Sequence, residues 1–191
     1  MFFNIIAAID KNNGIGFYNK NTNVYSLPWK NKVDMKFFKD LTINTKLPYL
    51  KNVVIMGRNT WESLPVNSKN SLKYLPNRIN IVVTSHPELI HKNNKSTDDI
   101  PTSDDICKAL KSLSLVKSKH KPIEINNKII KTAKNLDDAL HICSTIQNID
   151  KIFVIGGATL YKDALNHNKL NYIYINQIDN KYNCNIFFPD Y

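Results

Sequence analysis

The sequence predicts an α/β fold, in which a single domain is built on a largely parallel central sheet flanked by helices. Three observations support this prediction. The chain has 191 residues, a length that suits one domain with a sizeable core. It contains five short runs rich in β-branched and aromatic residues, and most are almost continuously apolar, as in strands that are covered on both faces. Helical patterns lie between these runs, and strands that alternate with helices are typical of the α/β class.

Five runs are expected to form the strands. "NIIAAI" (4–9) lies at the start of the chain, and "NVVIMG" (52–57) runs into a glycine. "INIVVTS" (79–85) is rich in Ile and Val and stops shortly before a proline. "KIFVIGG" (151–157) ends in two glycines, and "NYIYINQI" (171–178) combines Ile with Tyr. Short runs of this composition, bounded by turn residues, favour strands.

Helices are expected in the connections between these strands. In 33–41, Val33, Phe37 and Leu41 recur on one helical face, and Asp34 and Phe38 share the neighbouring stripe. The residues expected to face solvent are Lys36, Lys39 and Asp40. The other helical patterns occupy about 59–64, 136–147 ("LDDALHICSTIQ") and 159–165 ("TLYKDAL").

Two insertions interrupt the single domain expected for 1–191. Residues 17–26, "FYNKNTNVYS", are expected to form a polar loop. Residues 88–127 are rich in Lys, Asn and Ser and contain one plausible helix, 103–113, which Ser103 could cap. Insertions of this length usually lie outside the core, so both are expected to be peripheral.

The composition limits the partners and the location of the protein. The formal net charge is +10, but lysines are spread along the chain without an Arg-rich cluster, which argues against nucleic acid and membrane surfaces and leaves a small polyanionic ligand. Three isolated cysteines, Cys107, Cys143 and Cys184, indicate neither a metal site nor a disulfide framework. The first ten residues lack the basic start of a signal peptide and reach Asp10 too soon for one, and no apolar run has membrane-spanning length, so a soluble, cytoplasmic protein is expected.

Asp34 is unusual because it lies among Trp29, Val33, Met35 and Phe37. Desolvation disfavours a charged carboxylate in such a setting. One interpretation is that Asp34 occupies the first turn of a helix, where an acid suits the macrodipole. The other is that an apolar site holds the carboxyl group for a chemical task. The stretch alone leaves both open.

Three strand ends carry residues suited to phosphate groups. Gly57 is followed by Arg58, Asn59 and Thr60 at a helix start, and Gly156 and Gly157 precede another helix; such starts present free N–H groups to anions. The third strand end carries Thr84, Ser85 and His86. The alternative at each strand end is that these residues only form the turn that ends the strand and bind no phosphate. "GIG" at 14–16 lacks a third glycine and a following helix, so it does not support a Rossmann fold.

Taken together, these motifs resemble the dihydrofolate reductase family. The matching segments, in the family's order, are "AAIDKNNGIG", "LPWKNKVDMKFF", "VVIMGRNTWESLP", "LPNRINIVVTS", "NLDDAL", "FVIGGATLYKDAL" and "FFPDY". The match covers most of the chain outside 17–26 and 88–127. An acid five residues after the Trp of "LPW", together with "MGR-x-T-W-E-S", makes the resemblance specific.

The resemblance implies NADPH-dependent reduction of 7,8-dihydrofolate to 5,6,7,8-tetrahydrofolate, a step of one-carbon metabolism that antifolates block. Asp34 matches the acid that binds the pterin ring and helps to protonate N5 while hydride reaches C6. The residues implied at the substrate are Ile6, Ala7, Asp34, Met35, Phe38, Leu64, Leu75, Arg78, Ile155 and Tyr161. Those implied at the cofactor are Ala8, Ile15, Gly16, Gly57, Arg58, Asn59, Thr60, Thr84, Ser85, His86, Gly156, Gly157, Ala158, Thr159 and Leu160.

Individual roles follow from the same resemblance. The carbonyls of Ile6 and Ile155 would meet the pterin edge, and Arg78 would clamp the glutamate α-carboxylate. The p-aminobenzoyl group would contact Phe38, Leu64 and Leu75, and the nicotinamide would lie near Ala8 and Tyr161. Thr84, Ser85 and His86 match the site of the adenosine 2′-phosphate, which implies NADPH rather than NADH.

The sequence departs from the family pattern at four places. Asn176 stands where Thr commonly braces the acid, and Asn185 stands for the Asp of "D-x-x-F-F-P". The loop before Leu27 is longer than usual. The chain stops at Tyr191, where the family continues into a last antiparallel hairpin, so that hairpin is expected to be missing. Two readings stay open: a fragment of a longer chain, such as the reductase part of a fusion with thymidylate synthase, or a shortened protein whose exposed sheet edge is covered by self-association or another partner.

Two other functions stay open on the sequence. The pyrimidine reductase of riboflavin synthesis is related in fold, although "LPW" with Asp34 and the Arg78 clamp favour folate. A degenerate module that binds nucleotide or folate without turnover is the third reading, motivated by Asn176, Asn185 and the missing hairpin.

Overall fold

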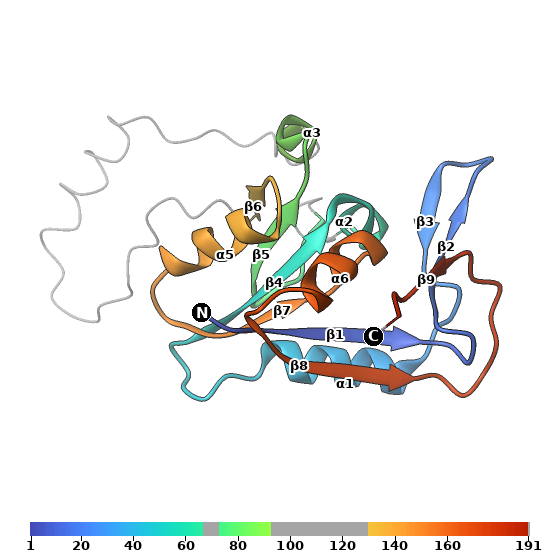
Figure 1. Ribbon diagram of the computed structural model, residues 1–191, viewed down its shortest axis with the longest axis horizontal. Coiled ribbons are helices and arrows are strands. Elements are labelled where there is room, and N and C mark those ends of the chain that lie inside the picture. Colours follow the sequence, from blue (N-terminus) through green and yellow to red (C-terminus); the bar gives the residue numbers. More distant parts are fainter. Residues whose placement is uncertain (67–72, 93–129, 191) are drawn as a thin grey trace, which may run out of the picture.

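A computed structural model of the chain describes residues 1–66, 73–92 and 130–190. Its main sheet has six strands, each parallel to its neighbours, in the order β6-β5-β4-β7-β1-β8 (Figure 1). The strands are β1 (Phe3–Ile9), β4 (Lys51–Gly57), β5 (Ile79–Val83), β6 (Ile130–Ala133), β7 (Ile149–Val154) and β8 (Leu170–Gln177). The predicted α/β fold is therefore confirmed, and each of the five predicted strands is present. No antiparallel strand joins this sheet within the described residues.

Three strands end earlier than predicted: β8 by one residue, at Gln177, β5 by two and β7 by three. β5 stops at Val83, because the chain turns after it, with the His86 N–H donating to Thr84 Oγ1 at 3.0 Å. β7 stops at Val154, since Gly156 has a φ of +122°, which a continuing strand cannot contain. β6 was not predicted, because four residues give too short a pattern.

The helices cover both faces of the main sheet. Figure 1 shows α5 and α6 on one face and α1 on the other. The helices are α1 (Lys32–Ile43), α2 (Arg58–Ser63), α3 (Pro87–Lys92), α5 (Leu136–Ser144) and α6 (Ala158–Leu165). Asn side chains cap α1 and α5: Asn31 accepts from two backbone N–H groups, and Asn135 accepts from that of Asp138. α5 ends three residues before its predicted end at 147, at a turn in which Thr145 N–H donates to Ile142 O.

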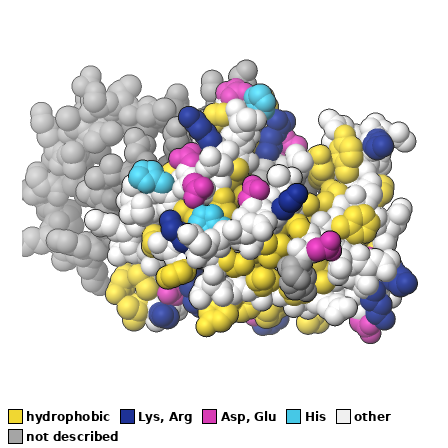
Figure 2. Space-filling view, viewed as in Figure 1, with side chains coloured by type: hydrophobic (Ala, Val, Ile, Leu, Met, Phe, Trp, Pro, Cys, Tyr) yellow, Lys and Arg dark blue, Asp and Glu magenta, His cyan; other side chains and the backbone are white. Residues whose placement is uncertain are grey.

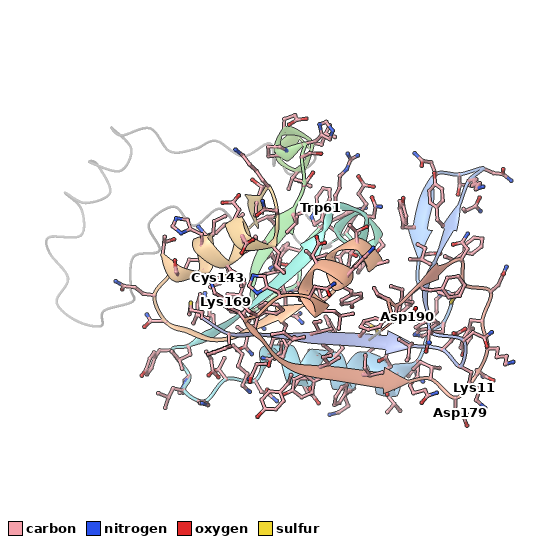
Figure 3. The ribbon with its side chains drawn as sticks, in the orientation of Figure 1. Lys11, Trp61, Cys143, Lys169, Asp179 and Asp190 are labelled. Carbon is pink, nitrogen blue, oxygen red and sulfur yellow. The ribbon has the colours of Figure 1, made fainter. Side chains whose placement is uncertain are left out.

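Each face of the sheet has its own apolar cluster. The first cluster packs β1, β4 and β7 against α5 and α6 and includes Phe3, Ile55 and Leu140. The second lies on the face that carries α1 and α2 and is centred on Trp61, whose indole N–H donates to Lys73 O at 2.8 Å (Figure 3). Burial on both faces explains why the strands read as continuous apolar runs.

A second, smaller sheet corrects the loop predicted for 17–26. It contains β2 (Gly14–Asn19), β3 (Val24–Ser26) and β9 (Ile186–Phe187), antiparallel and in the order β3-β2-β9 (Figure 1). The hairpin forms despite its polar sequence, because the rings of Tyr18 and Tyr25 pair across the strands at 4.6 Å and Asn23 takes a positive φ in the turn.

The buried stripe of α1 also differs from the prediction. Val33 and Phe37 are exposed to 78% and 43%, whereas Asp34 and Thr42 are buried. The helix docks through the 34/38/42 stripe, because Asp34 and Thr42 both find polar partners there. Counting apolar residues favoured the wrong face.

The second predicted insertion begins with a packed helix. Ile90 of α3 is fully buried in the second cluster, so 88–92 is not peripheral. The predicted helix 103–113, its cap Ser103 and Cys107 lie outside the described residues.

Three findings concern membranes, metals and surface charge. Within the described ranges, no helix is long and apolar enough to cross a membrane, and no three His, Cys, Asp or Glu side chains gather as a metal site would require. On the face drawn in Figure 2, Lys and Arg side chains are scattered rather than gathered in one patch.

Candidate functional site

Asp34 is the central acid of the site. It lies in the first turn of α1, where its N–H is held by the Asn31 side chain at 3.1 Å, and its side chain is only 5% exposed. The Asn176 side-chain amide on β8 donates to Asp34 Oδ1 at 2.7 Å. Asn176 pairs with Ala8 of β1, so the carboxyl group lies above the carboxyl ends of β1 and β8. The first interpretation is confirmed, because Asp34 occupies the first turn of α1. Asp34 is also buried, as the second interpretation requires, and its chemical task stays a prediction.

Ile6, two residues before Ala8 on β1, is joined to Tyr161 on α6. The Tyr161 hydroxyl on α6 donates to the Ile6 carbonyl at 2.8 Å. Burial raises the pKa of Tyr161, so the phenol stays protonated and remains a donor. The Tyr161 ring also packs on Phe188 at 4.8 Å. The pair fixes one carbonyl that the sequence assigned to the pterin edge.

Glycines allow the starts of α2 and α6 to meet. Gly57 N–H donates to Gly156 O at 2.7 Å, and the Gly156–Gly157 peptide is cis. A Cβ on Gly156 would lie 3.2 Å from Thr60 Oγ1, and one on Gly157 would lie 3.4 Å from it. Side chains at Gly156 and Gly157 would therefore crowd Thr60, and glycine at both positions lets the N-termini of the two helices approach each other.

The end of β5 lies beside this glycine surface. Gly57 and Val83 are register partners, so Thr84, Ser85 and His86 follow next to α2. Ser85 and His86 are exposed, whereas Thr84 is buried. Nearby, Arg58 Nε donates to Glu62 Oε1 at 2.7 Å, so one of its donors is already engaged.

Apolar side chains lead from Asp34 to an arginine. Phe38, Leu64 and Leu75 all pack against the second cluster. The Arg78 guanidinium carbon lies 5.8 Å from the centre of the Phe38 ring. Burial lowers the pKa of Arg78 to about 10, so it remains charged at neutral pH. No carboxylate of the described residues lies within ion-pair distance of it.

The remaining expected residues are more scattered. Met35 is exposed on α1, and Ala7 points to the opposite face of the sheet, where it joins the first cluster. Ile15 packs on that same cluster, and Gly16 accepts from the Asn185 N–H at 3.1 Å. Ala158, Thr159 and Leu160 form the first turn of α6, after Ile155 and the glycine pair, and Asn59 lies in the first turn of α2.

Three buried residues near the site had no assigned role. Thr42 bonds Arg78, and its position eight residues after Asp34, on the same helical stripe, could have indicated this. Trp29 is buried against Tyr182 at 5.2 Å, and its indole N–H has no partner in the described chain. Asp10 is buried and anchors the segment before β2; no local pattern marked it.

Comparison with known proteins shows the family of the chain. The family model described as "Dihydrofolate reductase" matches residues 2–116 and 102–191. The chain belongs to the dihydrofolate reductase family. This confirms the resemblance inferred from the motifs, while the individual site roles remain expectations.

Several relatives are similar over nearly the whole chain. A dihydrofolate reductase of Pneumocystis carinii is 33% identical over 197 residues, which cover 97% of this chain and 72% of that one. A bifunctional dihydrofolate reductase-thymidylate synthase of Daucus carota is 31% identical over 187 residues, 98% of this chain but 28% of that one. The chain thus spans about a quarter of the length of the bifunctional relatives it matches. The solved Schistosoma mansoni dihydrofolate reductase superposes with a TM-score of 0.64 and 31% identity, covering 100% of this chain and 81% of that one.

Proposed function

We propose that this chain is an NADPH-dependent reductase that converts 7,8-dihydrofolate to 5,6,7,8-tetrahydrofolate. One observation carries the proposal: a buried carboxyl group, Asp34, braced by Asn176 at the ends of β1 and β8 in a member of this family. Such a group can both bind the N–H donors of a pterin ring and supply a proton.

The substrate is proposed to lie along α1. Its pterin ring would bind Asp34 and the carbonyls of Ile6 and Ile155, and its benzoyl group would contact Phe38 and the nearby leucines. Arg78 would bind the glutamate α-carboxylate. Its charge and the lack of a carboxylate neighbour among the described residues support this role, because a partly buried guanidinium favours an anionic partner.

The residues present fit NADPH. The starts of α2 and α6, which Gly57, Gly156 and Gly157 bring close together, would offer backbone N–H groups to a pyrophosphate, and Thr84, Ser85 and His86 offer hydroxyls and an imidazole for the 2′-phosphate. Ala8 and Tyr161 would lie at the nicotinamide. When bound, NADPH supplies a hydride for C6 of the substrate.

Asp34 is proposed to promote proton delivery to N5. An imine accepts hydride more readily when its nitrogen is protonated, and a carboxyl group shielded from bulk water is a suitable proton source. Asn176 holds Asp34 Oδ1, which leaves Oδ2 for the substrate. Asn176 and Asn185 both make the contacts of bracing residues, so these departures do not favour a module without turnover.

One assay tests this proposal against its alternatives. The loss of NADPH absorbance is followed with dihydrofolate, and then with a pyrimidine substrate of riboflavin synthesis. Oxidation with dihydrofolate alone is expected. Oxidation only with the pyrimidine would indicate the riboflavin enzyme, and binding of dihydrofolate without oxidation would indicate a degenerate module.

We also propose that another polypeptide covers β8, in a cytoplasmic assembly. β8 is an edge of the described main sheet, and Tyr172 on it is 60% exposed; free edges pair readily with other chains. The partner would be a second copy or a thymidylate synthase, because the Daucus carota relative combines a dihydrofolate reductase with a thymidylate synthase. Sedimentation of the 191-residue chain, alone and with a thymidylate synthase, tests this. A chain that sediments as a monomer, both alone and with the synthase, would contradict the proposal that another polypeptide covers β8.

A further inference from the structure

Thr42 is a fully buried residue of α1 with a defined hydrogen-bond polarity. Its Oγ1 donates to the Phe38 carbonyl at 2.7 Å and accepts from Arg78 Nη1, also at 2.7 Å. A hydroxyl has only one proton. Because that proton points to Phe38, a lone pair of Thr42 must face the guanidinium.

The Arg78 guanidinium is thereby held at two points. Its Nε donates to Pro76 O at 3.1 Å and its Nη1 to Thr42. A guanidinium has five N–H donors, so three remain, and a bidentate carboxylate needs two. Arginine otherwise has large rotamer freedom, which a ligand would have to restrict on binding. The two contacts restrict it before the ligand arrives.

Thr42 itself is fixed to the sheet through Asn52. The buried Asn52 side chain donates to the carbonyls of Thr42 and Asn44 at 3.0 and 3.1 Å, and accepts from Lys151 N–H at 3.0 Å. Asn52 lies on β4 and Lys151 on β7. A continuous polar chain therefore runs from the central strands through the end of α1 to Arg78.

Asp34 and Thr42 are the two buried residues of α1. Their separation of eight residues corresponds to about 12 Å along a helix, and both belong to the same i, i+4, i+8 row of side chains. We propose that Thr42 is a positioning residue that aims Arg78 at the tail carboxylate of the substrate, so that α1 sets the distance between the two recognised ends. This inference rests on the proposed function. It assigns to Thr42 selectivity for substrates with a carboxylate at that distance.

The test uses two substrates and matched variants. Thr42→Val removes the hydroxyl and keeps the shape, Thr42→Ser restores it, and Thr45→Val is the control, since Thr45 bonds Leu47 O instead. KM and kcat are measured with dihydrofolate and with 6-methyl-7,8-dihydropterin, which has no tail. We expect Thr42→Val to raise KM for dihydrofolate about tenfold, as for a lost bond to a charged group, with kcat unchanged. KM for the tailless substrate should not change.

A double-mutant cycle separates positioning from folding. In an Arg78→Leu background, Thr42→Val should add nothing, because the group it aims is gone. Equal effects on both substrates, or effects that add to those of Arg78→Leu, would show that Thr42 only supports the helix. Either result would overturn the inference.

A binding measurement distinguishes failure of the inference from failure of the proposed function. Calorimetry compares folic acid with its α-carboxamide on the wild type and on Thr42→Val. The wild type should prefer folic acid, and the variant should lose most of that preference, even if turnover is absent. A wild type that binds both compounds equally, or neither, refutes the role of Thr42, whatever the turnover assay gives.

Discussion

The side-chain amide of Asn176 donates a 2.7 Å hydrogen bond to the Asp34 carboxylate, although 142 positions separate the two residues. The bond joins α1 to β8, close to the end of that strand. There, Asn176 is the register partner of Ala8 on the neighbouring strand β1. A donor to a carboxylate favours one orientation of the group. The orientation of the proposed catalytic acid therefore depends on a side chain from the far end of the chain.

Removal of this amide should impair the acid. We expect Asn176→Ala to lower kcat/KM for dihydrofolate roughly tenfold, the scale of a lost bond to a charged group. Asn176→Thr should retain most activity, because a hydroxyl can also donate. Steady-state NADPH oxidation measures both variants. Wild-type rates in the alanine variant would show that Asp34 needs no brace.

Asn185 should control the β2–β3 hairpin. Its Oδ1 accepts from Tyr18 N–H at 2.7 Å, and its Nδ2 donates to Tyr18 O at 2.9 Å. Loss of both contacts in Asn185→Ala should free the hairpin, and kcat should fall several-fold, as for loops that close over an active site. The control is Asn183→Ala, at an exposed position in the same segment. Identical kcat values for Asn185→Ala and Asn183→Ala would show that anchoring of the hairpin does not affect turnover.

Cofactor preference should depend on charge at the end of β5. NADPH is expected to have a higher kcat/KM than NADH, and added salt should narrow the ratio, because salt screens exposed charges. His86→Ala should further reduce the ratio of kcat/KM for NADPH to kcat/KM for NADH. His141→Ala on α5 should leave this ratio unchanged. The kcat/KM ratio at two ionic strengths measures this. Equal values for the two cofactors in the wild type would refute the 2′-phosphate site.

Asp10 should make stability depend on acid pH. Burial opposes its ionisation, but the N–H groups of Tyr182, Gly14 and Asn12, with the Cys184 thiol, hold its pKa below the ordinary value. A folded-state pKa below the unfolded one stabilises the protein above the unfolded pKa, and this is lost as pH falls through the folded pKa. Urea midpoints should therefore show that Asp10→Asn is destabilising at neutral pH, and that the difference shrinks below about pH 4.

The control for this experiment is Asp179. Lys11 lowers the pKa of Asp179 too, and the two side chains form a 2.6 Å ion pair (Figure 3). Asp179 is 93% exposed, however, and exposed pairs contribute little. Asp179→Asn should barely shift the urea midpoint at any pH. A shift equal to that of Asp10→Asn would mean that general charge, not the buried hydrogen bonds, sets the acid response.

The main sheet was predictable because its signals are local. Apolar runs that end at Gly57 and at Gly156 mark both the strands and their turns into helices. The β2–β3 hairpin was not predictable in this way. Its residues are polar, and its support from Asn185 comes from 167 positions away in the sequence.

The site was predictable in composition but not in orientation. The motif around Asp34 identified the acid, but apolar counting placed Val33 and Phe37 inward. The true stripe is chosen by Asn176 and Arg78, which meet α1 only after the chain has folded. A sequence pattern reports the preferences of one segment and cannot supply the partners of its polar side chains.

The most direct test of the account compares the wild type with Asp34→Asn. NADPH oxidation with dihydrofolate is measured from acid to alkaline pH, and folic acid binding is measured alongside. At neutral pH the variant should lose at least about 10²-fold in kcat while it still binds ligand, and the loss should shrink as solvent protonates the substrate at lower pH. A variant with wild-type kcat at pH 7 and above would contradict the central claim that Asp34 supplies the proton.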